Sequence, residues 1–324
     1  MSIDYIYKSI AFDGTGVLQR DSDLFADLAS SPMGAGRIDG SEMVRVKIFS
    51  SHHALPETPV TATKIFEPIL TNIPMELADG IVTDKSGSNI AGKATFGSVR
   101  QHYFVWKNLA PKLDYVGFEQ YRRVFFIDPL PSDVLEKEFP TLLGLRQKIL
   151  RSATDGLVQE SVGPELFAAY MNMRASWTDD VVKRVKSWID GFDIIYPRPY
   201  RPSTIESIGK NIETQWKVCH RPEVWDPFVL ILKRTTYFRT HKLLIDFDME
   251  CFPVHNMYIM RRDFFYEYMG IWQECFFELE GLFPNAEPRM WEWLSERLFA
   301  LFCAQKRLEM PLLRTCELPV LFNG

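Results

Sequence analysis

The chain has 324 residues, of which 46% are hydrophobic and 24% charged, and its formal net charge is −5. This balance is typical of a globular protein with a large core, organised as one large domain or two modest ones. The acidic net charge argues against a protein that binds nucleic acid over a wide surface, because such proteins present basic faces to the phosphates.

The cysteines and the N-terminus predict the compartment. Five cysteines are present, an odd number with no C-x-x-C pair, which favours reduced, buried thiols over a disulfide or metal site. The first residues lack the basic start and apolar run of a signal peptide, and no stretch reaches the roughly 18 apolar residues of a membrane span. We therefore expect a cytoplasmic protein.

Residues 1–43 are predicted to be an N-terminal extension, because glycines interrupt them and their hydrophobic periodicity is weak. One domain, residues 44–324, should follow. Alternating or buried apolar runs predict strands, and apolar residues at helical spacing predict helices. The expected strands are 44–49, 115–118, 121–126, 192–196 and 256–260, and the expected helices are 95–109, 179–189, 264–282 and 288–308. Strands that alternate with helices predict an α/β sheet with parallel members.

Several well-known site motifs are missing from the sequence. It contains no G-x-G-x-x-G, no Walker loop, no G-x-S-x-G elbow and no H-E-x-x-H. This excludes most dehydrogenases, P-loop kinases, α/β hydrolases and zincins.

Polar side chains instead gather where strands are predicted to end. His52 and His53 follow the first strand, residues 84–90 form a polar loop, and Arg122 and Arg123 follow the second strand. Ligands of open α/β sheets bind at the carboxyl ends of the strands. Adjacent arginines are costly to bury without an anionic partner, and the guanidinium fork matches phosphate oxygens. An anion site and a structural ion pair both remain open for this pair.

A second basic feature is the segment 198–242, which has nine basic and four acidic residues in an acidic protein. One interpretation is a solvated face. The other is a surface for an anion, either a donor pyrophosphate or the phosphate head of a lipid-linked acceptor at the membrane.

Taken in order, the motifs resemble the bacterial capsular-polysaccharide and lipopolysaccharide glycosyltransferases with an "HYRR" signature, some of which are galactofuranosyltransferases. The similarity spans about residues 45–305 and is carried by the order and spacing of short motifs. These are residues 47–49 with His53, 87–90 after Asp84, 106–108, 115–117, 121–123, 193–195 with His220, 256–260, and 294–298 after Arg289.

The resemblance implies a GT-A-like α/β fold with a mostly parallel central sheet flanked by helices. It implies transfer of a sugar, galactofuranose or galactose among the candidates, from a UDP-sugar to a growing surface-polysaccharide acceptor. That acceptor would be a glycan or a lipid-linked glycan, with peripheral contact at the inner membrane face as an open alternative and no nucleic-acid partner. The donor-binding residues carried over are His53, Asp84, Asn89, Tyr121, Arg122, Arg123, Asn256 and Arg289.

Glycosyl transfer requires positive charge on the leaving diphosphate, and an inverting transfer also requires a carboxylate or His that takes the acceptor proton. Arg122 and Arg123 are the favoured cations. The competing candidate is a Mn²⁺ or Mg²⁺ ion at the D-x-D sequence Asp246-Phe247-Asp248. Asp248 and Glu296 are the candidate catalytic bases.

Four positions near this expected site depart from the pattern of the family. Gln120 stands in place of His, Ser98 and Arg100 in place of Glu and Thr, and Glu292 in place of Gly. These departures motivate a second hypothesis, in which the chain is a non-catalytic glycan-binding or scaffold module of a polysaccharide synthase complex.

Overall fold

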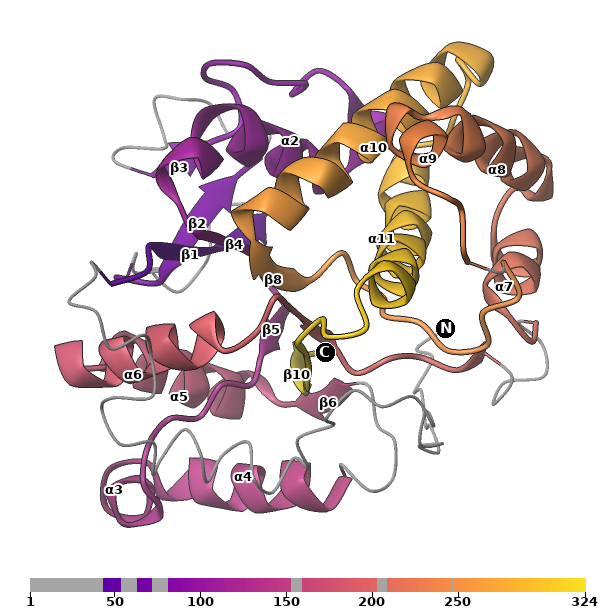
Figure 1. Ribbon diagram of the computed structural model, residues 1–324. Helices are drawn as coiled ribbons and strands as arrows, with labels where there is room; N and C mark the ends of the chain where they lie inside the picture. Colours follow the sequence, from indigo (N-terminus) through magenta and orange to yellow (C-terminus); the bar gives the residue numbers. More distant parts are fainter. Residues whose placement is uncertain (1–42, 54–62, 72–80, 153–158, 203–208, 246) are drawn as a thin grey trace.

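The computed structural model describes residues 43–53, 63–71, 81–152, 159–202, 209–245 and 247–324 (Figure 1). The expected N-terminal extension lies outside these ranges apart from Met43. Regular structure in the described part begins with strand β1 (Val46–His52). The predicted end of this strand at Phe49 was wrong, because the backbone pairing with β2 continues as far as His52, opposite Leu70.

A twisted sheet forms the centre of the molecule. One half follows the order β3-β2-β1-β4, with every neighbouring pair parallel. The added strands are β2 (Phe66–Leu70), β3 (Val82–Thr83) and β4 (Tyr115–Gln120). Because these strands are parallel, their carboxyl ends meet at one edge of the sheet, where α/β proteins bind ligands.

Beyond β4 the sheet divides into two branches. One branch runs through β8 (Tyr258–Arg261) and β7 (Ile194–Pro197) to β9 (Thr315–Leu318). The other runs through β5 (Arg123–Phe125) and β10 (Val320–Asn323) to β6 (Gln159–Val162). Among the described strands, five pairings are parallel and four antiparallel. The predicted α/β fold is confirmed, and the antiparallel members come from β5 and β8.

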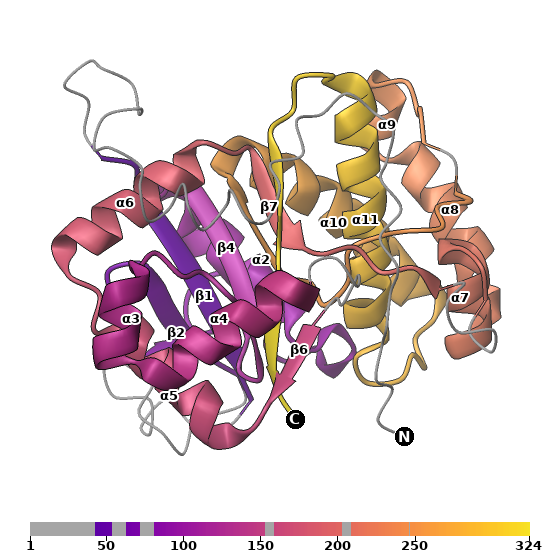
Figure 2. The same cartoon turned by 90° about the horizontal axis from the view of Figure 1, so that it is seen from below.

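Helices cover both faces of the sheet, and side-chain alternation along each strand divides the core between them (Figures 1 and 2). On β4, Val116 and Phe118 face one cluster while Tyr115 faces the other. The first face carries α2 (Val99–Asn108), α7 (Ile212–Cys219), α8 (Trp225–Arg234), α9 (Thr236–Thr240), α10 (Arg262–Leu282) and α11 (Met290–Glu309). The second carries α3 (Ser132–Glu138), α4 (Pro140–Ser152), α5 (Pro164–Ala175) and α6 (Asp179–Asp190).

The three later helices were predicted to within two residues at each end. The first predicted helix, 95–109, was wrong at its start. A short 3₁₀ turn, Ala94–Phe96, comes first, and α2 begins only at Val99. The cause is Gly97, whose φ of +50° interrupts the helical backbone.

A buried histidine joins α2 to the sheet. His102 stacks on Phe118 with ring centroids 3.7 Å apart, and its Nδ1 lies 2.7 Å from the Tyr258 hydroxyl. Complete burial lowers the pKa of His102 from 6.5 to about 3. The folded state therefore holds this imidazole neutral, whereas the unfolded chain protonates it below about pH 6.5.

This difference predicts a pH-dependent stability. Because the folded pKa is depressed, the contribution is complete above pH 6.5 and is lost as the pH falls toward 3. From pH 6.5 to 5 the loss should be about 2 kcal/mol. Urea unfolding at several pH values should show a flatter pH dependence for His102→Gln than for the parent. The exposed His241, replaced in the same way, is the control and should leave the slope unchanged; equal slopes for all three proteins would contradict the prediction.

Candidate active site

A small polar cavity of about 60 Å³ lies at the carboxyl ends of β1 and β4. Four separate parts of the chain form it: the end of β1, the residue before α2, the turn after β4, and the start of α11. The lining residues are Ser51, His53, Ser98, Gln120, Tyr121, Arg122, Arg123, Arg289 and Glu292. Five of the eight predicted donor-binding residues thus lie together.

The turn between β4 and β5 presents the two arginines. Gln120 and Arg123 pair across it, so Tyr121 and Arg122 occupy its tip. Arg122 is exposed, and its guanidinium carbon lies 5.3 Å from the centroid of the Tyr121 ring. Arg123 is held more firmly: its Nε donates to Gln159 Oε1 at 3.2 Å and its Nη1 to Gln120 Oε1 at 3.3 Å. Both arginines line the cavity, and only Arg123 also bonds to β6.

The buried carboxylate of Glu292, near the start of α11, accepts hydrogen bonds from two other residues that line the cavity. Ser98 Oγ donates to Glu292 Oε1 at 2.6 Å, and Arg289 Nε donates to Oε2 at 2.7 Å. A Cβ on Gly97 would stand 2.0 Å from Glu292 Oε2, so only glycine fits beside this carboxylate. Two of the departures from the family pattern, Ser98 and Glu292, therefore contact each other directly.

A strained turn before β8 supports the same region. His255 and Asn256 have φ values of +79° and +52°, which non-glycine residues rarely adopt. Gln120 Nε2 donates to the His255 carbonyl at 2.8 Å, and Asn256 Nδ2 donates to the Glu292 carbonyl at 2.7 Å. Such backbone strain concentrates at functional sites. Gln120, which also departs from the family pattern, therefore forms hydrogen bonds to both Arg123 and this turn.

The candidate base Glu296 lies behind the cavity, one helical turn after Glu292 and on the same face of α11. Burial raises the pKa of the Glu296 carboxyl above its usual 4.5, and Glu292 adds to the rise. The guanidinium groups of Arg297 and Arg123 oppose it. Arg297 Nη1 donates to Glu296 Oε2 at 2.9 Å. The result is a carboxyl with increased basicity beside the arginine-lined cavity.

Two further polar groups are buried at the same edge of the sheet. Asp84, directly after β3, is 1% exposed, and neither of its carboxylate oxygens receives a hydrogen bond within the described ranges. Arg100 Nε lies 3.6 Å from Oδ2; burial raises the pKa of Asp84 and Arg100 opposes the rise. The ring Nε2 of His52 has no hydrogen-bond partner among the described residues either. Buried polar groups are normally satisfied, so these atoms are available to a water molecule, an ion or a polar ligand.

The predicted donor-binding residue Asn89 shapes its own loop. Its Nδ2 donates to the carbonyl oxygen of Gly87 at 3.0 Å, and its Oδ1 accepts from the Ala91 N–H at 3.1 Å. Asn108 closes the loop from α2, because its Oδ1 accepts from the Ser88 N–H at 3.1 Å. A donor contact for Asn89 stays a prediction.

Asp248 lies apart from this group. It is exposed in the loop after α9, where its Oδ1 accepts from Asn211 Nδ2 at 2.9 Å. Its partner in the D-x-D sequence, Asp246, lies outside the described residues. Within the described ranges, no three His, Cys, Asp or Glu side chains are grouped to hold a metal ion. The metal ion at the D-x-D sequence and the role of Asp248 stay predictions.

Sequence reasoning missed Gln159 and the aromatic Phe322 beside the arginines. Arg123 lies 4.4 Å from the Phe322 ring centroid. The pairing of β5, β10 and β6, which are far apart in the chain, places both residues beside the arginines. Nothing in their local sequence indicates this pairing.

The mixed sheet, the helices on both faces and the polar cavity at the strand ends define a GT-A-like α/β fold. The solved apo structure of WbbM, a bifunctional glycosyltransferase, is similar, with a TM-score of 0.59 and 22% sequence identity. The similarity covers 86% of this chain and 45% of that one, so this chain spans less than half of that protein. At this level of identity the comparison establishes the fold.

Residues 47–307 match the family described as "Domain of unknown function (DUF4422)", and the chain belongs to that family. No curated protein matches the chain. None of the helices in the described ranges combines the length and apolar character needed to cross a membrane.

Proposed function

We propose that this chain is a glycosyltransferase that moves a sugar from a UDP-sugar to a growing surface-polysaccharide acceptor, as its resemblance to the HYRR-type enzymes implies. The observation that carries the proposal is the cavity at the strand ends, where three arginines converge in front of a carboxyl with a raised pKa. The similarity in fold to WbbM, itself a glycosyltransferase, supports a transferase. Galactofuranose and galactose are the favoured sugars.

The donor would lie across the edge of the sheet. Its diphosphate would bind Arg122 and Arg123 in the cavity, because guanidinium groups bind phosphate oxygens in a bidentate manner. Its nucleoside would extend toward Asp84 and His52, whose buried polar atoms lack hydrogen-bond partners within the described ranges, although Asp84 is ion-paired with Arg100. Glu292 neutralises the guanidinium of Arg289 in the structure. When the donor binds, its diphosphate would take the place of Glu292 beside Arg289.

The chemistry then needs one proton transfer. The acceptor oxygen forms a bond to the anomeric carbon while the bond from that carbon to the phosphate oxygen breaks. The leaving diphosphate takes the electron pair beside the arginines, and the Glu296 carboxylate takes the acceptor proton. A raised pKa makes this carboxylate a stronger base near neutral pH. Asp248 remains the alternative base.

A Mn²⁺ or Mg²⁺ ion is the alternative stabiliser of the leaving group, with Asp246 and Asp248 as its candidate ligands. Activity that disappears with EDTA and returns with Mn²⁺ would favour this alternative over the arginines.

The arginines supply the test of the function. Arg122→Ala should keep the parent melting temperature but slow UDP-sugar hydrolysis about ten- to hundredfold, because a charge-assisted contact of roughly 1.5–3 kcal/mol is lost. Arg123→Ala should lower both rate and stability, since it also removes bonds to Gln120 and Gln159. Excess UDP should stabilise the parent by about 2.7 kcal/mol at a hundredfold excess over its dissociation constant.

Arg221→Ala is the matched control, because this arginine pairs with exposed Glu223 outside the cavity. Parent-like hydrolysis by both cavity variants would remove the arginines from the mechanism. Stabilisation by GDP- or dTDP-sugars alone would contradict the uridine donor.

The second candidate function is the non-catalytic glycan-binding or scaffold module. The observation in its favour is Glu292, a carboxylate that already occupies the guanidinium of Arg289. A transferase leaks some free nucleotide diphosphate from its donor, whereas a scaffold does not, so hydrolysis separates the two functions.

A further inference from the structure

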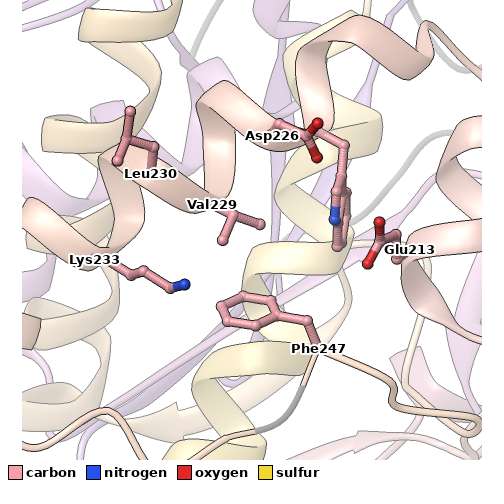
Figure 3. Close-up of a pocket in the computed structure, with 7 residues that line it drawn as sticks. Glu213, Asp226, Val229, Leu230, Lys233 and Phe247 are labelled. Carbon is pink, nitrogen blue, oxygen red and sulfur yellow. The ribbon is translucent and has the colours of Figure 1, made fainter.

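A larger hollow lies among the helices of the first face, between α7, α8 and the loop after α9 (Figure 3). Its volume is about 280 Å³. We call it the α7–α8 groove. Its lining includes Glu213 from α7, Asp226, Val229, Leu230 and Lys233 from α8, and Phe247 from the loop.

The centre of the groove is apolar and accessible. Leu230, which lines the groove, is 57% exposed, so its side chain is open to a ligand. The Phe247 ring, also partly exposed, faces α8, and Lys233 Nζ lies 5.5 Å from its centroid. The ring also packs against the core of the first face, and its exposed part offers an apolar contact to a ligand.

The rim of the groove carries two carboxylates beside one lysine. Lys217 Nζ lies 2.5 Å from Glu213 Oε1 and 3.4 Å from Asp226 Oδ1. Each carboxylate has lone pairs beyond this contact and can accept further hydrogen bonds. Acceptors around an apolar ring surface match a sugar, which presents a C–H face and a border of hydroxyl donors.

The charges of the groove favour a neutral sugar over an anionic lipid surface. Anionic headgroups would meet the carboxylates of Glu213 and Asp226, and this repulsion offsets the attraction of Lys233. Neutral hydroxyl groups meet no such penalty.

The groove lies one helix away from the candidate active site. Glu213 is two residues before Gln215 in α7, and Gln215 Oε1 accepts a hydrogen bond from Arg297 Nη2. Arg297 in turn pairs with Glu296. These contacts connect the α7 side of the groove to the candidate base on α11.

We propose that the α7–α8 groove binds the acceptor glycan at sugar units remote from the reacting hydroxyl. The inference rests on the proposed transferase function and adds to it a second carbohydrate site. Remote binding of this kind supplies energy that positions the reacting end of a long acceptor.

The test measures glycan binding by the full chain in the absence of donor. The probes are immobilised neutral oligosaccharides built from galactose, glucose or mannose, together with phosphatidylglycerol vesicles. The parent should bind at least one oligosaccharide class, and Phe247→Ala should weaken that binding about tenfold, the effect of one lost ring contact. Val218→Ala, a similarly exposed apolar position on α7 that does not line the groove, should bind like the parent.

Melting temperatures confirm that each variant is folded, and donor hydrolysis is measured on the same preparations. The groove proposal is overturned if no oligosaccharide binds, if Phe247→Ala binds as the parent does, or if Phe247 affects only vesicle binding. Hydrolysis without glycan binding overturns the groove alone. Phe247-dependent glycan binding without hydrolysis supports the groove and instead contradicts the transferase.

Discussion

Glu119→Gln is expected to lower the free energy of unfolding by about 3–5 kcal/mol. Glu119 and Arg174 form an ion pair at 2.7 Å, with both side chains almost completely buried. Ser50 Oγ also donates to Glu119 at 2.7 Å, and the guanidinium of Arg174 lies 3.3 Å from the Phe66 ring centroid. Removal of the negative charge leaves Arg174 charged and uncompensated in the core.

A double variant sharpens this prediction. Glu119→Gln combined with Arg174→Met should be more stable than the sum of the single changes implies, because no lone charge remains. The exposed pair Lys183 and Asp180, 3.8 Å apart, is the control, and Lys183→Ala should cost less than about 0.5 kcal/mol. Urea unfolding measures the parent, the single variants Glu119→Gln and Arg174→Met, the double variant and the control. Additive losses in the double variant would show that the pair contributes no coupled stability.

Glu296→Gln is expected to lower the rate of sugar transfer about 100- to 10,000-fold while donor binding stays near that of the parent. Glutamine keeps the size and an acceptor for the Arg297 guanidinium, but it cannot take a proton. In the parent, transfer should weaken as the pH falls through the raised pKa of Glu296, because the protonated carboxyl is no longer a base. This acidic limb should be missing from the residual activity of the variant.

Glu287→Gln provides the matched control, since this exposed glutamate lies just before α11 and lines neither cavity nor groove. Single-turnover transfer and UDP binding are measured for each protein. Parent-like transfer by Glu296→Gln would move the role of base to Asp248, for which Asp248→Asn is the corresponding variant.

The fold class, four helices and the central strands were predictable because their hydrophobic periodicity is clear. The prediction missed α3, α4, α5, α7, α8 and α9, as well as strands β2, β3, β6, β9 and β10. The helix around residues 179–189 begins behind Thr178, whose side chain accepts from the Val181 N–H, and such caps can be seen in sequence. The branching of the sheet could not be predicted. It depends on β5, β9 and β10, strands of three or four residues whose partners lie far away in the chain.

The candidate site was predictable as a set of residues but not as a set of contacts. Arg122, Arg123, His53 and Arg289 meet in the cavity as expected. Glu119, only three residues before Arg122 in the sequence, instead holds Arg174 inside the core. Local sequence indicates that a side chain is polar, whereas its partner depends on packing between distant elements.

The contact between Ser98 and Glu292 bears on the resemblance to the HYRR-type glycosyltransferases. That resemblance implies Glu at the first position and Gly at the second, whereas this chain has a serine at the first and carries the acid on the facing helix. Two acids would repel at this distance, and with neither acid Arg289 would lose its counter-charge. We therefore expect positions 98 and 292 to covary. One of the two would carry the carboxylate, so that the charge of the cavity stays the same.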